Sequence, residues 1–244
     1  GTVYSRMYLD SNTIGQLNFD ADLNISSSAG SNSQATVSVL LFNKPGLTLE
    51  LNPNLKMQTN FIVANGTCAN PINIRSSLSG TQATMIKSSG SIACDRITLK
   101  DIEAIGGANF VATNSYDFGN VTGWTINTPA PRSLYWVGGT GNWSDAAHWS
   151  TVSGGAGGVC VPGPTDDIFF DANSFSSTGG EFIYADLQNS YCKNFTSIGT
   201  SSNNAITASI NGSYLFINIY GSLNFDSAAP KIDYSNLSFR SSNS

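Results

Sequence analysis

The chain has 244 residues, of which 40% are hydrophobic and only 11% are charged, and its formal net charge is −5. This length can bury a large core as one or two domains. No basic run provides the footprint of a nucleic-acid partner, and no apolar stretch of about 18 residues predicts membrane insertion. Gly, Ser, Thr and Asn replace charged residues, which is typical of turn-rich β structure.

Short alternating apolar runs recur along the chain and predict strands. In chain order they occupy residues 47–51, 72–74, 97–100, 215–219, 223–226 and 237–239. Asn and Ser fill the outward phase, which suits stacked rungs because repeated like charges would repel one another. We therefore predict an all-β chain of right-handed parallel β-helix modules, with a small antiparallel excursion within residues 135–149. An antiparallel β-sandwich is the alternative.

One segment of the chain repeats at long range. Residues 15–21 (GQLNFDA) match residues 221–227 (GSLNFDS), and the two segments lie 206 positions apart. This spacing predicts a module of about that length, of which the sequence is an excised piece; a chance match in a β-rich chain of low complexity is the alternative. Residues 1–128 are then the rear part of one module and 135–244 the front part of the next. Residues 129–134, with Pro129 and Pro131, form the junction.

The four cysteines are Cys68, Cys94, Cys160 and Cys192. They form no Cys-x-x-Cys pair, and a single histidine cannot complete a usual zinc set. An even number in an acidic chain rich in Ser, Thr and Asn indicates export and disulfides. Because short loops close at the least entropic cost, we expect Cys68–Cys94 and Cys160–Cys192. Buried free thiols are the alternative.

Residues 135–149 hold three of the four tryptophans and the only histidine. One interpretation is a sugar-binding platform in which Trp136, Trp143 and Trp149 stack on pyranose rings beside His148 and Asp145. Their spacing around the glycine-rich turn at 138–141 favours the other interpretation, in which the tryptophans pack on one another. In that interpretation His148 is a surface or capping residue.

Several carboxylates invite a catalytic or metal-binding interpretation: Asp145, Asp166, Asp167 and Asp171. Paired acids occur in glycosidases and in calcium sites. The nearest basic residues, Arg132 and Lys193, share no motif with them, and such Asp residues commonly fix turns. There is also no Gly-x-Ser-x-Gly elbow and no phosphate loop before a helix. We expect no catalytic residue, no metal and no cofactor, with calcium as the alternative.

The segment Tyr-Trp-Val-Gly-Gly-Thr-Gly-Asn-Trp-Ser-Asp-Ala-Ala-His-Trp-Ser at 135–150, followed by Val-Pro-Gly-Pro-Thr-Asp-Asp-Ile-Phe-Phe-Asp at 161–171, resembles a known module opener. It is similar to the opener of large repetitive β-helix surface proteins of Bacteroidota. Those proteins use type IX secretion, and some are gliding-motility adhesins. The segments at 80–84, 97–102, 106–110 and 118–124 resemble closing rungs of the same modules.

This resemblance implies a secreted, extracellular segment on the cell surface with a structural or adhesive role. Its partners would be neighbouring modules, the type IX export machinery and a surface polysaccharide. The motif Asp226-Ser227-Ala228 also resembles the O-glycosylation pattern of these bacteria, which makes Ser227 a candidate site, with a plain turn as the alternative. A carbohydrate-binding module and, less favoured, a β-helix polysaccharide-degrading enzyme are the other functional hypotheses.

Overall fold

A computed structural model describes residues 5–28, 33–175, 180–187, 189–200, 204–207, 209–210, 213–214, 216–226, 231–233 and 236–240. The chain divides into two compact units, Gly1–Pro129 and Ala130–Ser244. The division falls within the proline-containing segment at 129–134. The candidate O-glycosylation site Ser227 lies outside the described residues.

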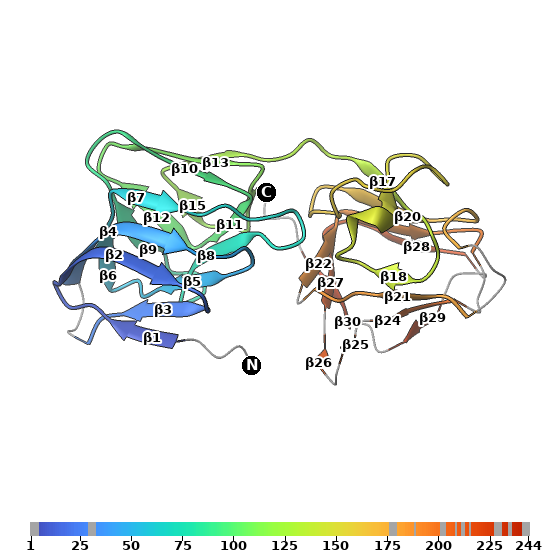
Figure 1. Ribbon diagram of the computed structural model, residues 1–244, viewed down its shortest axis with the longest axis horizontal. Coiled ribbons are helices and arrows are strands. Elements are labelled where there is room, and N and C mark those ends of the chain that lie inside the picture. The colour runs from blue at the N-terminus through green and yellow to red at the C-terminus, as the bar shows by residue number, and fades with distance from the viewer. Residues whose placement is uncertain are drawn as a thin grey trace. The chain divides into compact units, whose positions relative to one another are not determined.

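Unit 1 is built from three parallel sheets (Figure 1). Sheet A has the order β1 (Ser5–Tyr8), β3 (Leu23–Ser26), β5 (Thr48–Leu51), β8 (Ile72–Ser76), β11 (Ile97–Lys100) and β14 (Tyr116–Asp117). Sheet B has the order β15 (Val121–Thr122), β12 (Ile102–Ile105), β9 (Ala83–Ile86), β6 (Leu55–Gln58), β4 (Ser33–Phe42) and β2 (Thr13–Phe19), and β7 (Phe61–Val63) also pairs with β4. Sheet C has the order β10 (Ser91–Asp95), β13 (Asn109–Thr113) and β16 (Trp124–Asn127).

From β8 to β16 the chain visits sheets A, B and C in the same order three times. Each pass adds one strand to each sheet, and every strand pair in unit 1 is parallel within the described residues. A parallel sheet needs a crossover between neighbouring strands, and the other two sheets supply that crossover here.

The core of unit 1 comes from inward side chains that lie in register on successive strands. Leu23, Leu49, Ile74 and Leu99 occupy matched positions on β3, β5, β8 and β11 and are at most 5% exposed. Because side chains alternate along a strand, the intervening residues point outward. Burying one such aliphatic side chain contributes roughly 1.5–3 kcal/mol. Stacking therefore extends one continuous apolar column through the unit.

The corners of unit 1 also stack. Asp101 and Asn120 both adopt positive φ (54° and 56°), and Asn120 Nδ2 donates to Asp101 Oδ1 at 2.8 Å. Asn and Asp tolerate this conformation better than most residues. At Gly123 a Cβ would lie 1.9 Å from the Ala104 carbonyl oxygen, so the close approach of two rungs requires glycine there.

Unit 2 has the same kind of order. Sheet D runs β19 (Trp149–Ser150), β17 (Ser133–Trp136), β20 (Asp167–Phe170), β23 (Asn194–Ser197) and β28 (Leu223–Phe225). Sheet E runs β18 (Gly141–Asn142), β21 (Phe182–Tyr184), β24 (Ala205–Thr207) and β29 (Lys231–Asp233). Sheet F runs β22 (Asn189–Cys192), β27 (Phe216–Ile219) and β30 (Asn236–Phe239), and β25 (Ser209–Ile210) pairs with β26 (Ser213–Tyr214) in sheet G.

Two antiparallel pairs interrupt the parallel order of unit 2 within the described residues: β17 with β19, and β25 with β26. The first places Trp136 opposite Trp149, so the predicted antiparallel excursion at 135–149 is confirmed. Strand β19 also occupies one edge of sheet D, where a further parallel strand would otherwise pair. The 3-10 turn η1 (Ala146–His148) precedes β19.

The prediction of an all-β chain is confirmed, and its sheets are predominantly parallel as expected. The alternative of an antiparallel β-sandwich was wrong, because sheets A to C are parallel and sheets D to F are parallel apart from β19. Among the described residues there is no helix of the length and hydropathy that a membrane crossing requires.

Candidate functional site

The tryptophan cluster, Trp136, Trp143 and Trp149, lies at the start of unit 2. All three side chains are 0% exposed. The Trp149 ring meets Trp136 at 5.2 Å and 88° and Trp143 at 5.0 Å and 70°, measured between ring centroids and planes. These are edge-to-face contacts, the arrangement that aromatic quadrupoles favour. Phe170 from β20 lies below the cluster, 6.2 Å from both Trp136 and Trp149.

Backbone carbonyls of the same segment accept hydrogen bonds from two of the indoles. Trp136 Nε1 donates to the Gly139 carbonyl at 2.7 Å, and Trp149 Nε1 donates to the Trp143 carbonyl at 2.9 Å. Trp143 Nε1 is buried and has no hydrogen-bond partner among the described residues. The cluster thus ties its own connecting loop to the aromatic core.

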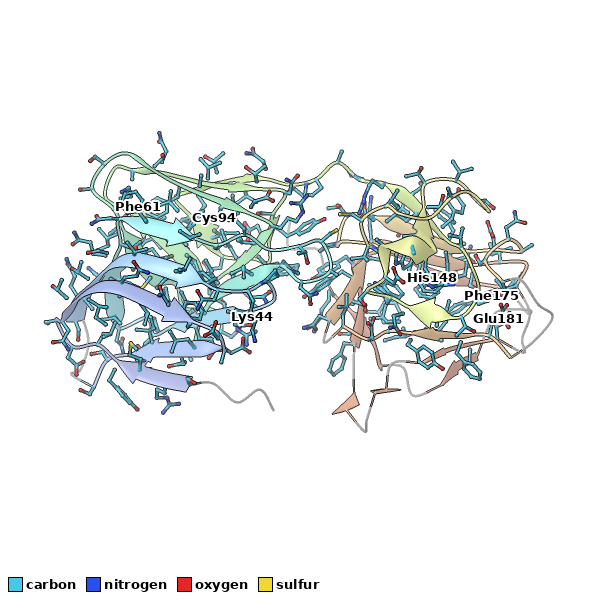
Figure 2. The ribbon with its side chains drawn as sticks, in the orientation of Figure 1. Lys44, Phe61, Cys94, His148, Phe175 and Glu181 are labelled. Atoms are coloured by element: carbon cyan, nitrogen blue, oxygen red, sulfur yellow. The ribbon has the colours of Figure 1, made fainter. Side chains whose placement is uncertain are left out.

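His148, labelled in Figure 2, adds a fourth aromatic ring to the cluster. Its ring stacks on Trp136 at 4.7 Å and 8°, and its Nδ1 lies 2.8 Å from the Val137 carbonyl oxygen. A Cβ at Gly141 would lie 2.1 Å from His148 Nε2, so the loop fits around the imidazole only as glycine. His148 is partly buried and holds this loop in position, so its contacts are structural.

The sugar-platform interpretation of Trp136, Trp143, His148 and Trp149 was therefore wrong for the tryptophans. A pyranose needs an open aromatic face, and each indole face is covered by a neighbour. Asp145 has a separate task as the N-cap of η1, where its Oδ1 accepts from the Ala147 N–H at 2.9 Å.

Asp166 is the most buried of the candidate carboxylates, at 1% exposure. Arg132 donates to it through Nε and one terminal nitrogen, at 3.1 and 2.6 Å. The backbone N–H groups of Arg132 and Gly163 donate at 2.9 and 2.8 Å. Arg132 also donates to the carbonyls of Cys160 and Val161, both at 3.1 Å. Four donors satisfy the carboxylate, so Asp166 holds a loop onto the first strand of the unit.

The other two acids also have structural partners. Asp167 Oδ1 accepts from Asn194 Nδ2 at 2.6 Å on the next strand. Asp171 Oδ1 accepts from the Asn173 N–H at 2.9 Å, and the Asp171 N–H donates to Ser174 Oγ at 2.9 Å, which closes a turn. In the part of the chain that the structure describes, no group of three or more His, Cys, Asp or Glu residues could hold a metal ion.

The cysteines depart from the expected pairing. Cys68 and Cys160 are disulfide-bonded, whereas Cys94 and Cys192 are free and buried. Cys94 points into the core of unit 1 in register with Ala112 (Figure 2), and Cys192 is fully buried in unit 2. Neither expected pair, Cys68–Cys94 or Cys160–Cys192, therefore forms, because strand alternation turns the Cys94 and Cys192 side chains into the cores.

The free thiols lie in surroundings that disfavour their ionised form. Burial raises the pKa of the Cys94 thiol to about 12. Burial also raises the pKa of Cys192, with a further increase from the negative charges of Asp167 and Asp166. Neither thiol is therefore a nucleophile near neutral pH.

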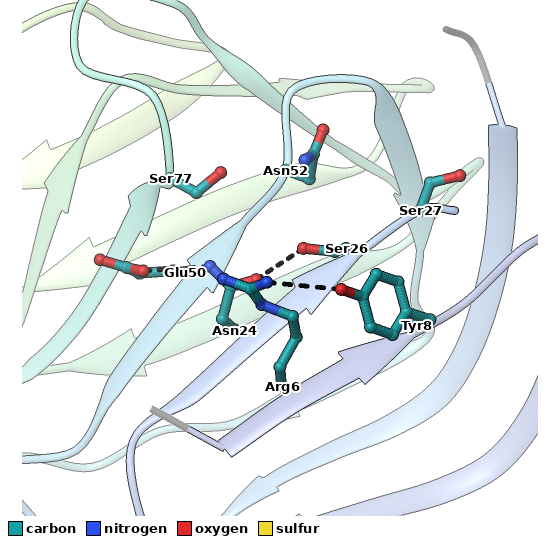
Figure 3. Close-up of a pocket in the computed structure, with 8 residues that line it drawn as sticks. All are labelled: Arg6, Tyr8, Asn24, Ser26, Ser27, Glu50, Asn52 and Ser77. Carbon is teal, nitrogen blue, oxygen red and sulfur yellow. Dashed lines mark hydrogen bonds between the residues drawn. The ribbon is translucent and has the colours of Figure 1, made fainter. Parts of the chain in front are cut away.

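A polar groove on sheet A of unit 1, hereafter the sheet A groove, escaped the sequence analysis. It has a volume of about 450 Å³ and is lined by Arg6, Tyr8, Asn24, Ser26, Ser27, Glu50, Asn52 and Ser77 (Figure 3). The outward alternation on each strand was visible in the sequence. The strand register, which aligns Arg6 with Asn24 and Asn24 with Glu50, could not be predicted from the sequence, because it depends on the number of residues in each rung.

Comparison with protein-family models, with curated proteins and with solved structures found no match for this chain.

Proposed function

We propose that the chain is a structural and adhesive segment of a large secreted cell-surface protein, built as right-handed parallel β-helix modules. The observation that carries this proposal is the repeated passage of each unit through the same three sheets. Parallel crossovers are right-handed almost without exception. A coil of this kind gains length by adding rungs, each of which contacts only its neighbours.

The tryptophan cluster fits this role as a cap. A solenoid needs its end rungs closed, since an open end exposes apolar side chains and unpaired strand edges. The indoles cover the apolar column at the start of unit 2, and β19 occupies the edge of sheet D. In the proposal, the cap marks the front of one module, and unit 1 is the rear of the preceding module.

Two further observations support a secreted, non-enzymatic role. A disulfide suits an oxidising compartment. The carboxylates considered as catalytic candidates have structural partners, which are Arg132 for Asp166, the η1 backbone for Asp145 and Asn194 for Asp167. The resemblance of residues 135–171 to Bacteroidota surface modules adds the type IX export machinery and neighbouring modules as partners.

The proposal is tested with antibodies raised against the recombinant chain and applied to intact cells of the bacterium that encodes it. We expect the antibodies to label cells that have not been permeabilised, and their Fab fragments to reduce attachment to a polysaccharide-coated surface under flow. Fab fragments against an unrelated surface protein are the control. Labelling that appears only after permeabilisation would contradict the proposal.

A further inference from the structure

The sheet A groove gathers polar side chains from several rungs of unit 1. Its floor consists of outward side chains on β1, β3 and β5, and the corners after β5 and β8 form its far side (Figure 3). Parallel register places these groups one strand spacing apart, about 4.8 Å. A chain of sugar rings or a single ring can thus meet several rungs at once.

A network of hydrogen bonds already fixes the floor of the groove. Glu50 Oε1 accepts from Arg75 at 2.9 Å, and Glu50 Oε2 accepts from Asn24 Nδ2 at 3.1 Å. Asn24 Oδ1 accepts from Ser26 Oγ at 2.6 Å, and Asn24 and Ser26 are both only 8% exposed. The ion pair with Arg75 offsets the negative charge of Glu50. These side chains are therefore held in place before any ligand arrives, which reduces the ordering cost of binding.

Arg6 supplies the remaining positive charge. It is exposed, and it makes no ion pair among the described residues; its guanidinium donates to the Tyr8 hydroxyl at a long 3.4 Å. Figure 3 shows its side chain between those of Glu50 and Tyr8. A planar guanidinium with free N–H groups matches a carboxylate in two parallel hydrogen bonds.

Aromatic and amide groups flank this charge. Tyr8 is 52% exposed, so part of its ring can pack against a ligand. Asn52 Oδ1 accepts from the Asn54 N–H at 2.8 Å, and the Asn52 side chain lines the groove. Ser77 adds an exposed hydroxyl. An open aromatic ring beside convergent polar groups suits a ligand with an apolar ring face and hydroxyl edges.

We infer that the sheet A groove binds an acidic oligosaccharide through one uronic acid residue. Arg6 holds the carboxylate, Tyr8 packs on the ring, and Asn52, Ser77 and Glu50 meet the hydroxyl groups. The inference rests on the proposed adhesive function and assigns it a ligand class. A polyphosphate backbone fits less well, because it calls for several cations and the chain carries a net charge of −5.

The test is calorimetric titration of the chain with tetragalacturonate as the acidic probe and cellotetraose as the neutral probe. We expect saturable binding of the acidic probe that weakens as salt is added, and binding of the neutral probe that is at least about tenfold weaker. Arg6→Gln should reduce affinity for the acidic probe about tenfold and remove the salt dependence. Tyr8→Leu should reduce it by a similar factor, whereas Tyr8→Phe keeps the ring and most of the affinity.

The matched control is Lys100→Gln, an exposed cation on the same outward row of sheet A but outside the groove. It should leave the affinity unchanged. Circular dichroism checks that each variant is folded. The inference is overturned if the wild type does not bind the acidic probe, if Arg6→Gln and Lys100→Gln behave alike, or if both probes bind equally.

These outcomes are separable from those of the proposed function. If calorimetry detects no binding of tetragalacturonate but the antibodies label intact cells and block attachment, the ligand inferred for the groove is wrong and the proposed surface role is still supported. Labelling only inside permeabilised cells would remove the surface role, whatever the titration shows.

Discussion

Replacement of Trp149 by alanine tests the capping role of the tryptophan cluster. Trp149 is fully buried, meets Trp136 and Trp143 edge to face, and lies 6.2 Å from the Phe170 ring. Its Nε1 also holds the Trp143 carbonyl. It is the ring that meets both other indoles edge to face, and like them it packs on Phe170 of the first full rung.

The expected loss follows from these contacts. Truncating a buried tryptophan or phenylalanine to alanine costs about 3–5 kcal/mol in transfer and cavity terms. Loss of the indole hydrogen bond adds about 1 kcal/mol, and partial collapse of the surrounding rings offsets some of the total. We expect Trp149→Ala to lower the free energy of unfolding of unit 2 by about 4–5 kcal/mol, and Trp149→Phe to fall between this variant and the wild type.

Urea denaturation followed by circular dichroism measures the free energy, and native-state hydrogen exchange locates the effect. Protection should fall in β17 and β20 and remain in β8 and β11, since the described contacts of Trp149 all lie in unit 2. The control is Val152→Ala, because Val152 is 62% exposed three residues later and should change stability by less than about 0.5 kcal/mol. A loss for Trp149→Ala below about 1 kcal/mol would refute the capping argument.

Three other predictions concern buried polar groups and thiols. Arg132→Gln leaves the buried Asp166 carboxylate without its cation and should cost about 3 kcal/mol in urea denaturation. The double variant Arg132→Gln/Asp166→Asn removes both charges and keeps an oxygen acceptor for the backbone N–H groups of Arg132 and Gly163, so it should recover most of the loss. Additive losses would show that the two charges do not interact. Alkylation without reductant should modify Cys94 and Cys192 only after unfolding, and modification of all four cysteines would disprove the disulfide. Because burial raises the pKa of Cys94 from 9.0 to about 12, the unfolded state releases this proton first as pH rises. The stability linked to the protonated Cys94 thiol is thus complete below about pH 9 and is lost toward pH 12, by up to about 4 kcal/mol. In urea denaturation across that pH range, the free energy of unfolding of Cys94→Ala should fall less steeply with pH than that of the wild type. Equal pH dependence in the two proteins would contradict a buried, protonated Cys94.

Strand positions in this chain could be predicted from the sequence because alternation is a local property. The run at 72–74 corresponds to β8 and the run at 97–100 to β11. The expectation that Asn and Ser fill the outward positions was only partly right in sheet A. Asn24 fits it, but the next two positions of the row are Glu50 and Arg75, whose opposite charges pair instead of repelling. These predictions needed only the period of two that strands impose on side chains.

The cysteine pairing could not be predicted by sequence proximity. Loop-closure entropy describes a flexible chain, whereas here the strand phase decides which thiols can meet. Alternation in 91–95 already places Cys94 on the same face as the buried Ile92. The same rule applied to 189–192 places Cys192 on the face of Ser190, toward the core. Deciding for each strand which alternate residues face the core would have predicted that the Cys94 and Cys192 thiols are buried.

The ion pair between Arg132 and Asp166 and the sheet A groove were missed for a different reason. Arg132 shares no motif with Asp166, and the two residues meet only because β20 pairs with β17 in parallel register. The groove likewise assembles residues from rungs of unequal length, so its composition depends on turn lengths that alternation does not reveal. The interpretation of the tryptophans as mutually packed needed no register, because their spacing around a tight turn already favoured it.

The most direct test of the capping assignment is the solvent accessibility of the three clustered tryptophans, measured in the variant Trp124→Phe. This substitution removes the only other tryptophan, so fluorescence then reports the cluster alone. We expect short-wavelength emission and strong protection from acrylamide quenching in the folded protein, unchanged by added oligosaccharides and abolished in urea. Emission and quenching that match the urea-unfolded chain, or that shift when a sugar is added, would contradict the burial of the cluster and its role as a cap.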